Sequence, residues 1–218
     1  MKKALFVTFE GVDGAGKSTQ AQMLLKKIKE CGVSVVLTRE PGGTRLAEKI
    51  RNLLLYDEEI KFSSVTEVLL YAASRAQHVA EVIQPALARG EVVICERFTD
   101  STLAYQGFAS GNDLEMIRQI DKVATGGLVP DLTFLLDLGP VEGWARVQER
   151  NNNGKHDRIE AKGSSFQEKV RQGYLEIAAN NQERVSIINC YGLGEKEIHH
   201  KIWRVFLEKF SFLREANQ

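Results

Sequence analysis

The feature that most constrains the fold of this chain is a glycine-rich segment near its N-terminus. It comprises Gly11, Val12, Asp13, Gly14, Ala15, Gly16, Lys17 and Ser18, and it fits the pattern G-x-x-x-x-G-K-[S/T]. The segment follows an apolar run at residues 5–9 and opens a stretch with helical spacing of apolar residues. This context predicts a phosphate-binding loop, or P-loop, between a buried strand and a helix.

The residue types of this loop have a direct chemical use. Glycines let the backbone curl so that its N–H groups converge on the β-phosphate of a nucleoside triphosphate, and the following helix adds partial positive charge. Lys17 is expected to span the β and γ oxygens, and Ser18 to bind Mg²⁺. ATPases, GTPases and kinases share such a loop, so the loop alone does not identify the acceptor of the phosphoryl group.

Apolar, strand-forming runs alternate with helical segments along the rest of the chain. With residues 5–9, the strand candidates are residues 33–37, 91–95, 132–136 and 185–188. The helix candidates are residues 17–31, 46–56, 65–88, 113–125, 141–150, 166–179 and 195–210. The alternation predicts an α/β fold of the P-loop NTPase type, with a five-stranded parallel sheet and helices on both faces.

The chain contains no repeat, linker or low-complexity tract, which favours a single domain over residues 1–218. An insert at about residues 150–163 begins with Asn-Asn-Asn-Gly and interleaves basic with acidic side chains. We expect this insert to be a short lid. A solvated surface loop is the alternative.

Composition excludes several kinds of partner and location. The 29 Lys and Arg residues balance 29 Asp and Glu residues, so no excess charge favours a nucleic-acid polymer or a membrane surface. The apolar run after Lys3 is too short for a signal peptide core or a membrane span. Three widely spaced cysteines, Cys31, Cys95 and Cys190, fit neither a disulfide framework nor a zinc site. A cytoplasmic protein with reduced thiols is therefore expected.

An acid and an arginine end the third predicted strand. In open α/β sheets ligands bind at the carboxyl ends of the strands, which is where Glu96 and Arg97 fall. We expect Ser18 and Glu96 to hold Mg²⁺, with Asp13 and Glu160 as alternative acids. Arg97 is expected to bind phosphate oxygens and to neutralise charge on the transferring group. The alternative is that Glu96 and Arg97 pair with each other.

Several multi-residue motifs in order resemble the thymidylate kinase family. They are TREPGGT at 38–44, YAASR at 71–75, ERF at 96–98, AYQG at 104–107, GLVPDLT at 127–133 and DRIE at 157–160. The resemblance runs from about residue 6 to residue 188. It implies Mg²⁺-dependent transfer of the ATP γ-phosphoryl group to dTMP, giving dTDP and ADP for dTTP biosynthesis. It also implies a homodimer, for which residues 65–88 could supply a surface or could simply be core.

The resemblance also implies which residues bind the acceptor. These are Arg51, Tyr71, Arg75, Arg97, Thr102, Tyr105 and Gln106. Tyr71 would stack on the thymine ring, and Arg75, one helical turn later, would hold the phosphate or the base edge. The alternatives are a core tyrosine with a surface arginine, and a Thr102–Gln106 stretch that only caps and packs a helix.

The P-loop departs from one variant of the family. Some thymidylate kinases carry an arginine inside the loop, whereas Gly14 and Ala15 resemble the bacterial subtype that supplies a catalytic cation from a basic lid. The basic residues of this region are Arg146, Arg150, Lys155 and Arg158. The expected catalytic residues are Lys17, Arg97, Asp13, Arg150 and Arg158. Glu96 stands where many family members have aspartate.

Two expectations concern what the chain lacks. His78, His156, His199 and His200 show no arrangement that suggests a general base, so a solvated surface role is expected for all four. An Asn-Lys-x-Asp motif for reading guanine is also missing, which disfavours a P-loop switch protein. A kinase for another nucleoside or nucleotide remains the nearest alternative.

Overall fold

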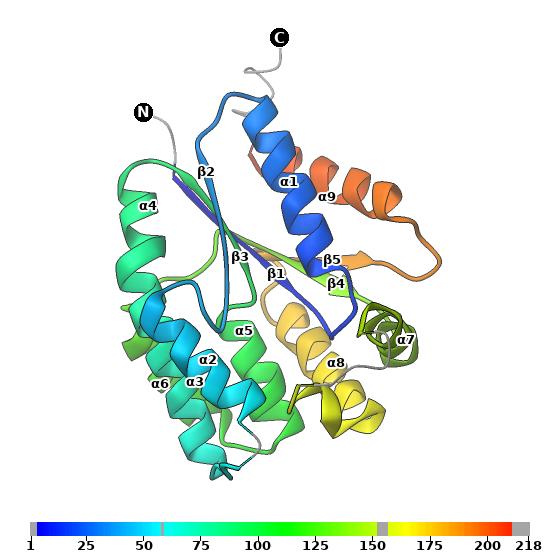
Figure 1. The fold of residues 1–218 in the computed structure, drawn as a ribbon. Coiled ribbons are helices and arrows are strands. Elements are labelled where there is room, and N and C mark those ends of the chain that lie inside the picture. The colour runs from blue at the N-terminus through cyan, green and yellow to red at the C-terminus, as the bar shows by residue number, and fades with distance from the viewer. Residues whose placement is uncertain (1–3, 58, 152–156, 211–218) are drawn as a thin grey trace.

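The computed structural model describes residues 4–57, 59–151 and 157–210, without the side chains of Arg150 and Asn151. One parallel sheet forms the centre of the molecule, with strand order β2-β3-β1-β4-β5 (Figure 1). The strands are β1 (Leu5–Glu10), β2 (Val35–Arg39), β3 (Val92–Glu96), β4 (Leu132–Asp137) and β5 (Val185–Asn189). The predicted five-stranded parallel sheet is confirmed, with the second strand starting two residues later than the apolar run.

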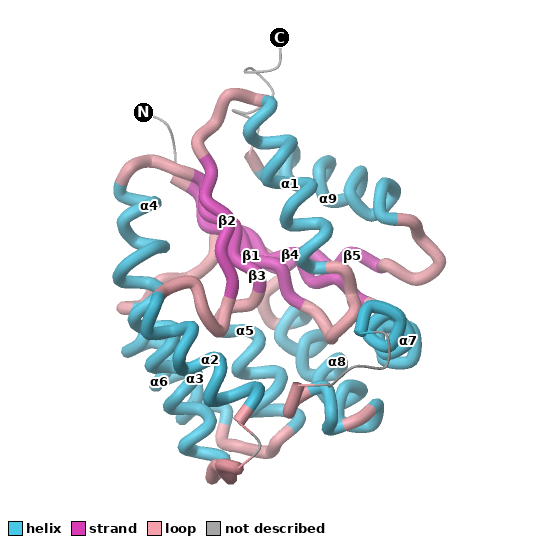
Figure 2. The backbone as a smooth tube through the Cα atoms, in the orientation of Figure 1, coloured by secondary structure: helices cyan, strands magenta, loops and turns pink. Residues whose placement is uncertain are grey.

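Helices cover both faces of this sheet, as Figure 2 shows. The long helices are α1 (Lys17–Glu30), α2 (Arg45–Tyr56), α3 (Ser64–His78), α6 (Leu114–Thr125), α7 (Pro140–Asn151), α8 (Ser164–Ala179) and α9 (Glu195–Lys209). Helix α1 packs against β1, β2 and β3 and also against α9, which lies on β5. On the opposite face lie α4 (Gln84–Ala88) and α8.

The predicted helix at 65–88 is one continuous helical rod with an irregular middle. Helix α3 runs into the π-helical turn η1 (Val79–Ile83) and then into α4. The structure also contains short helical segments that the apolar spacing did not predict. They are α5 (Thr99–Thr102), the π-helical turn η2 (Leu103–Ala109) and the 3₁₀ turn η3 (Glu160–Lys162). The π-helical turn η1 widens this rod locally. The spacing of apolar residues in an α-helix does not predict such a turn.

The strand register decides what meets at the carboxyl edge of the sheet. Phe9 of β1 lies opposite Glu96 of β3, and Arg39 of β2 lies opposite the same residue. Glu96 and the residues that follow β1 and β2 therefore meet along one edge. The P-loop follows β1 at this edge, as the sequence predicts.

The core lies between the sheet and both helix layers. Phe9 and Phe134, on the adjacent strands β1 and β4, are fully buried, and their ring centroids are 5.2 Å apart. On the α1 side, Leu24 and Ile202 are also fully buried. Among the described residues no helix combines the length and the apolar character that a membrane span requires.

We expect Phe134→Ala to lower the free energy of unfolding by about 3–5 kcal/mol, because it removes a fully buried ring and leaves a cavity between β1 and β4. Urea unfolding followed by circular dichroism measures this. Val141→Ala is the control, since Val141 is exposed and should change stability by less than about 0.5 kcal/mol. Equal losses in the two variants would contradict this description of the core.

Candidate active site

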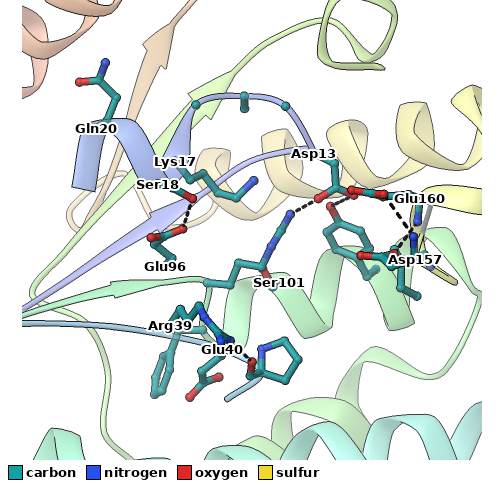
Figure 3. Close-up of a pocket in the computed structure, with 18 of the residues that line it drawn as sticks. Asp13, Lys17, Ser18, Gln20, Arg39, Glu40, Glu96, Ser101, Asp157 and Glu160 are labelled. Carbon is teal, nitrogen blue, oxygen red and sulfur yellow. Dashed lines mark hydrogen bonds and ion pairs between the residues drawn. The ribbon is translucent and has the colours of Figure 1, made fainter. Parts of the chain in front are cut away.

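A cavity of about 990 Å³ opens at the carboxyl edge of the sheet. The P-loop and the start of α1 line one part of it, and the ends of β2 and β3 line another. Residues of α3, α5 and η2 line a deeper part. Leu193 and Gly194, before α9, also line the cavity, and the Gln20 side chain of α1 donates to the Glu195 carbonyl just after them. Figure 3 shows how these side chains converge on the cavity. The cavity thus brings together residues from both ends of the chain.

The P-loop places its lysine against its own backbone. Gly16 adopts the left-handed conformation immediately before α1, with φ of 91°, which a residue without Cβ adopts at little cost. The Lys17 ammonium donates hydrogen bonds to the carbonyl oxygens of Gly11, at 3.1 Å, and Val12, at 2.8 Å. Burial and, after it, the positive charge of Arg97 lower the pKa of Lys17 to about 7, although the nearby carboxylates act in the opposite direction.

Ser18 and Glu96 meet beside the P-loop. The Ser18 hydroxyl donates to Glu96 Oε2 at 2.6 Å, a contact that Figure 3 marks between α1 and the end of β3. A hydroxyl and a carboxylate are the hard oxygen ligands that Mg²⁺ takes next to substrate phosphates. The residues predicted to hold the metal are therefore adjacent, and their chemistry fits that ion.

Arg97 has an unusual backbone and many partners. Its φ of 64° makes it the one non-glycine residue with positive φ among the described residues. Its guanidinium donates to the Gly11 carbonyl at 3.1 Å and to the Tyr174 hydroxyl at 3.2 Å, and it pairs with Asp13. The alternative that Arg97 pairs with Glu96 is wrong, because the carboxylate it meets belongs to the P-loop.

The strained backbone at Arg97 is held from β1. The Glu10 carboxylate accepts from the Phe98 N–H at 2.7 Å, from the Ser101 hydroxyl at 2.6 Å and from the Tyr174 hydroxyl at 2.8 Å. These bonds fix the residue after Arg97 and the first turn of α5. Through these hydrogen bonds Glu10 stabilises the strained backbone of Arg97. A residue in a strained conformation persists only with such support.

Asp13 links the P-loop to several elements. Besides Arg97, it accepts from the Gln167 amide of α8 at 3.0 Å and from the Tyr105 hydroxyl at 3.4 Å. Burial opposes its ionisation, but the charges of Arg97 and Lys17 and these hydrogen bonds lower its pKa below the ordinary value. Asp13 therefore stays an anion that holds Arg97 next to the loop.

The deeper part of the cavity contains the residues expected to read the acceptor base. Tyr71 and Arg75 lie one turn apart on α3, and both line the cavity together with Thr102 and Gln106. Arg75 is only 2% exposed, so the alternative of a surface arginine is wrong. The hydroxyl of Thr102 accepts from Arg75 at 2.9 Å, and Gln106 donates to Glu67 at 2.8 Å. These side chains line the cavity and are also held by hydrogen bonds within the protein. Their role in packing is therefore compatible with a role in binding.

A second arginine enters the cavity from α2. Arg51 donates to the Pro41 carbonyl at 2.9 Å, and Arg39 donates to the same oxygen at 3.0 Å. Both arginines line the cavity together with Arg97. These three arginines line the cavity along with Arg75 and Arg146.

The lid region is only partly described. The Arg150 side chain and residues 152–156, which include Lys155 and His156, lie outside the described residues. The Arg158 guanidinium donates to Glu67 and to the Leu54 carbonyl, each at 2.8 Å, and lies over the Phe62 ring. In this conformation its described partners are therefore on or near α2 and α3, and none is in the P-loop. Arg146 of α7 does line the cavity.

Helix α7 touches the P-loop backbone to backbone. A Cβ atom built on Gly14 would lie 2.1 Å from the Gly143 carbonyl oxygen, and one built on Gly143 would lie 2.5 Å from the Asp13 carbonyl oxygen. Gly14 also has a positive φ of 77°. This geometry explains why Gly14 carries no arginine, since any side chain there would collide with α7.

Sequence reasoning missed several residues of this site and misplaced one. His78 is fully buried and bonds to Thr38 and Glu40, so its expected surface position is wrong. The position of His78 within a predicted amphipathic helix gave no indication that its side chain would be buried. His200 is exposed and His199 is partly buried. The other missed residues are Glu10, Glu40, Asp121, Tyr174, Leu193 and Ile198. Glu40 lies in the TREPGGT motif, but the motif assigned it no role.

The pKa of Lys17 generates a prediction about proton uptake. Above about pH 7 the free protein holds Lys17 largely neutral, and phosphate oxygens bound beside it should raise the pKa again. Binding of a nucleoside triphosphate at about pH 8 should therefore take up close to one proton, and Kd should rise by up to about tenfold per pH unit. Calorimetry in buffers of different ionisation enthalpy measures this, with Lys17→Arg as the control that stays charged. Binding without proton uptake at that pH would contradict the lowered pKa.

Comparison with known proteins agrees with this geometry. The family model described as thymidylate kinase matches residues 9–202. The thymidylate kinase of Pseudomonas putida is 51% identical over 187 residues, or 85% of this chain and 87% of that protein. That of Pelotomaculum thermopropionicum is 48% identical over 200 residues, or 90% of each chain. A crystal structure of thymidylate kinase from Ehrlichia chaffeensis superposes with a TM-score of 0.73 at 36% identity, covering 93% of this chain and 98% of that one. The chain therefore belongs to the thymidylate kinase family.

Proposed function

We propose that this protein transfers the γ-phosphoryl group of ATP to dTMP, giving ADP and dTDP, as a step toward dTTP. The observation that carries the proposal is the composition of one cavity. It joins a P-loop, a cluster of three arginines and a deeper pocket lined by Tyr71 and Arg75. A donor triphosphate, an acceptor phosphate and a base each find a matching part of that cavity.

The donor side uses the P-loop. Lys17 would leave the Gly11 and Val12 carbonyls and follow the β and γ oxygens, while the loop N–H groups and the start of α1 hold the β-phosphate. Leu193 and Ile198 line the cavity next to this loop and offer an apolar wall to the adenine. Arg146, which lines the same cavity, would stack its planar guanidinium group on the adenine ring.

Ser18 and Glu96 are the residues proposed to hold Mg²⁺. When bound there, the ion would supply positive charge to neutralise the phosphate oxygens of ATP. The side chain of Glu96 reaches about one methylene further than an aspartate would, so it can hold the ion through a water molecule.

The acceptor side uses the rest of the cavity. Tyr71 is proposed to stack on the thymine ring, and Arg75, buried beside Thr102, to donate to the edge of the base. Tyr105 and Gln106 complete the sugar and base walls. Arg97 and Arg51 are proposed to bind the acceptor phosphate, because they line the same cavity as the P-loop and the base-side residues.

The reaction needs positioning and charge neutralisation more than proton transfer. An oxygen of the acceptor phosphate is already ionised near neutral pH and attacks the γ-phosphorus in line with the leaving ADP oxygen. Lys17 and Arg97 would neutralise charge on the transferring group, and Asp13 would keep Arg97 in place. Arg150 and Arg158 remain the proposed lid cations, brought in when the lid closes over both substrates.

The proposal includes one catalytic domain, a homodimer and a cytoplasmic location. Helix α3, which packs against α6, leaves Val65 and Leu69 exposed, and α6 leaves Val123 exposed. Such apolar side chains on adjacent helices are typical of a two-fold contact between identical subunits. The buried thiols of Cys95 and Cys190 suit a reducing compartment.

The direct test is ADP release with ATP, Mg²⁺ and each nucleoside monophosphate in turn. We expect dTMP to stimulate release selectively, because the deeper pocket combines a stacking ring with a fixed guanidinium. Lys17→Ala is the inactive control and should lower turnover by roughly two or more orders of magnitude.

Two other outcomes would change the account. If a different monophosphate gave the highest rate, the phosphoryl transfer would stand and the assignment of Tyr71 and Arg75 to thymine would fall. If no monophosphate stimulated ADP release, the kinase proposal itself would fall.

A further inference from the structure

A chain of buried hydrogen bonds runs from β2 to the base-side arginine. The Thr38 hydroxyl lies 2.6 Å from His78 Nε2, and His78 Nδ1 lies 3.0 Å from Glu40 Oε1. The other oxygen of Glu40 accepts from Arg75 Nε at 2.8 Å. His78 and Glu40 are 0% and 6% exposed. The sequence and the mechanism described above leave His78 and Glu40 without a role.

The partners fix the direction of each hydrogen bond. The Glu40 carboxylate is an acceptor, so His78 Nδ1 must carry the hydrogen that lies between them. In the tautomer that carries its hydrogen on Nδ1, Nε2 accepts from the Thr38 hydroxyl. The result is an ordered series in which Thr38 orients His78, His78 orients Glu40, and Glu40 orients Arg75.

Arg75 has little freedom at the end of this series. Its guanidinium carries five N–H groups, and the described residues account for four of them. Glu40 takes Nε–H, Asp121 takes one N–H of Nη1, and the two of Nη2 go to the Phe98 carbonyl at 3.0 Å and to Thr102. The remaining N–H belongs to Nη1, and Arg75 lines the cavity. The direction of that last donor depends on where Glu40 and Asp121 hold the plane of the guanidinium.

His78 also packs against the loop at residues 41–44. A Cβ atom added to Gly43 would lie 2.6 Å from the His78 ring and 2.8 Å from the Thr38 hydroxyl, so this loop lies directly on the imidazole. The same loop contains Pro41, whose carbonyl accepts from Arg51. His78 therefore contacts both Glu40, which holds the base-side Arg75, and the loop whose Pro41 carbonyl holds the phosphate-side Arg51.

We propose that His78 is a positioning residue for the acceptor nucleotide, acting through Glu40 on the direction of the Arg75 donor and through Gly43 on the loop at 41–44. The inference rests on the proposed function, because it takes the acceptor to be a pyrimidine monophosphate bound beside Arg75. His78 itself touches neither substrate. Its loss should weaken acceptor binding and leave ATP binding intact.

A metal ion is the competing explanation for this cluster. Glu40, His78 and Cys95 place one ligand atom each within 4.8 Å of one another. However, His78 Nδ1 and Glu40 Oε1 already bond to each other, and the Arg75 cation lies on the same carboxylate. Burial also raises the pKa of the Cys95 thiol, whereas a metal needs the thiolate. The hydrogen-bond series accounts for these contacts without an added charge.

The test compares His78→Phe with His78→Asn. Phenylalanine keeps a ring but removes both polar atoms, whereas the asparagine amide can place an N–H near the position of Nδ1 and keep the bond to Glu40. We expect His78→Phe to raise the Kd and KM for dTMP about tenfold, the effect of losing one hydrogen bond to a charged group. The kcat and the KM for ATP should stay within about twofold, and His78→Asn should recover most of the acceptor affinity.

Thr38→Val gives a second route if His78→Phe does not fold. It removes the first donor of the series with little change in volume, and the KM for dTMP should rise about threefold. His200→Ala, on the exposed side of α9, is the matched histidine control and should change nothing.

Three results would overturn the inference. They are an unchanged KM for dTMP in His78→Phe and Thr38→Val, equal losses toward ATP and dTMP, and one bound metal ion other than Mg²⁺ per wild-type chain that elemental analysis no longer finds in His78→Phe. Failure of the proposed function has a different signature, because the wild-type protein itself would then show no preference for dTMP in binding or turnover.

Discussion

The site depends on one arginine that a strained backbone holds against the P-loop. Arg97 has a positive φ, and Glu10 fixes the N–H of Phe98 directly after it. This turn brings the guanidinium back against the P-loop, where Asp13 and the Gly11 carbonyl hold it. An arginine placed by β1, β3 and the P-loop together is rigid before substrate arrives. Such preorganised charge is what a phosphoryl transfer enzyme needs most.

The close approach of α7 to the P-loop explains a second feature of the charge distribution. Gly14 and Gly143 meet through their backbones, which leaves no room for an arginine side chain at position 14. The same contact sets Arg146 of α7 at the cavity. Arg146 thus adds a cation to the cavity from outside the P-loop. The P-loop contributes only Lys17.

The sheet and the P-loop could be predicted from the sequence because their signals are local. Apolar runs mark all five strands within two residues, and the spacing from Gly11 to Ser18 fixes the turn between β1 and α1. The network beneath the base pocket could not be predicted in the same way. His78 joins Thr38, 40 residues away, and Arg75 joins Asp121, 46 residues away. A helical period places His78 on a face of α3 but does not reveal which loop covers it.

A crystal structure with dTMP and a non-hydrolysable ATP analogue tests the central claim most directly. The account predicts triphosphate oxygens in the P-loop with Lys17 turned toward them, the acceptor phosphate on Arg97, and the thymine ring on Tyr71 with its edge at Arg75. A thymine bound outside the Tyr71 and Arg75 pocket, or an acceptor phosphate that makes no contact with Arg97, would contradict it.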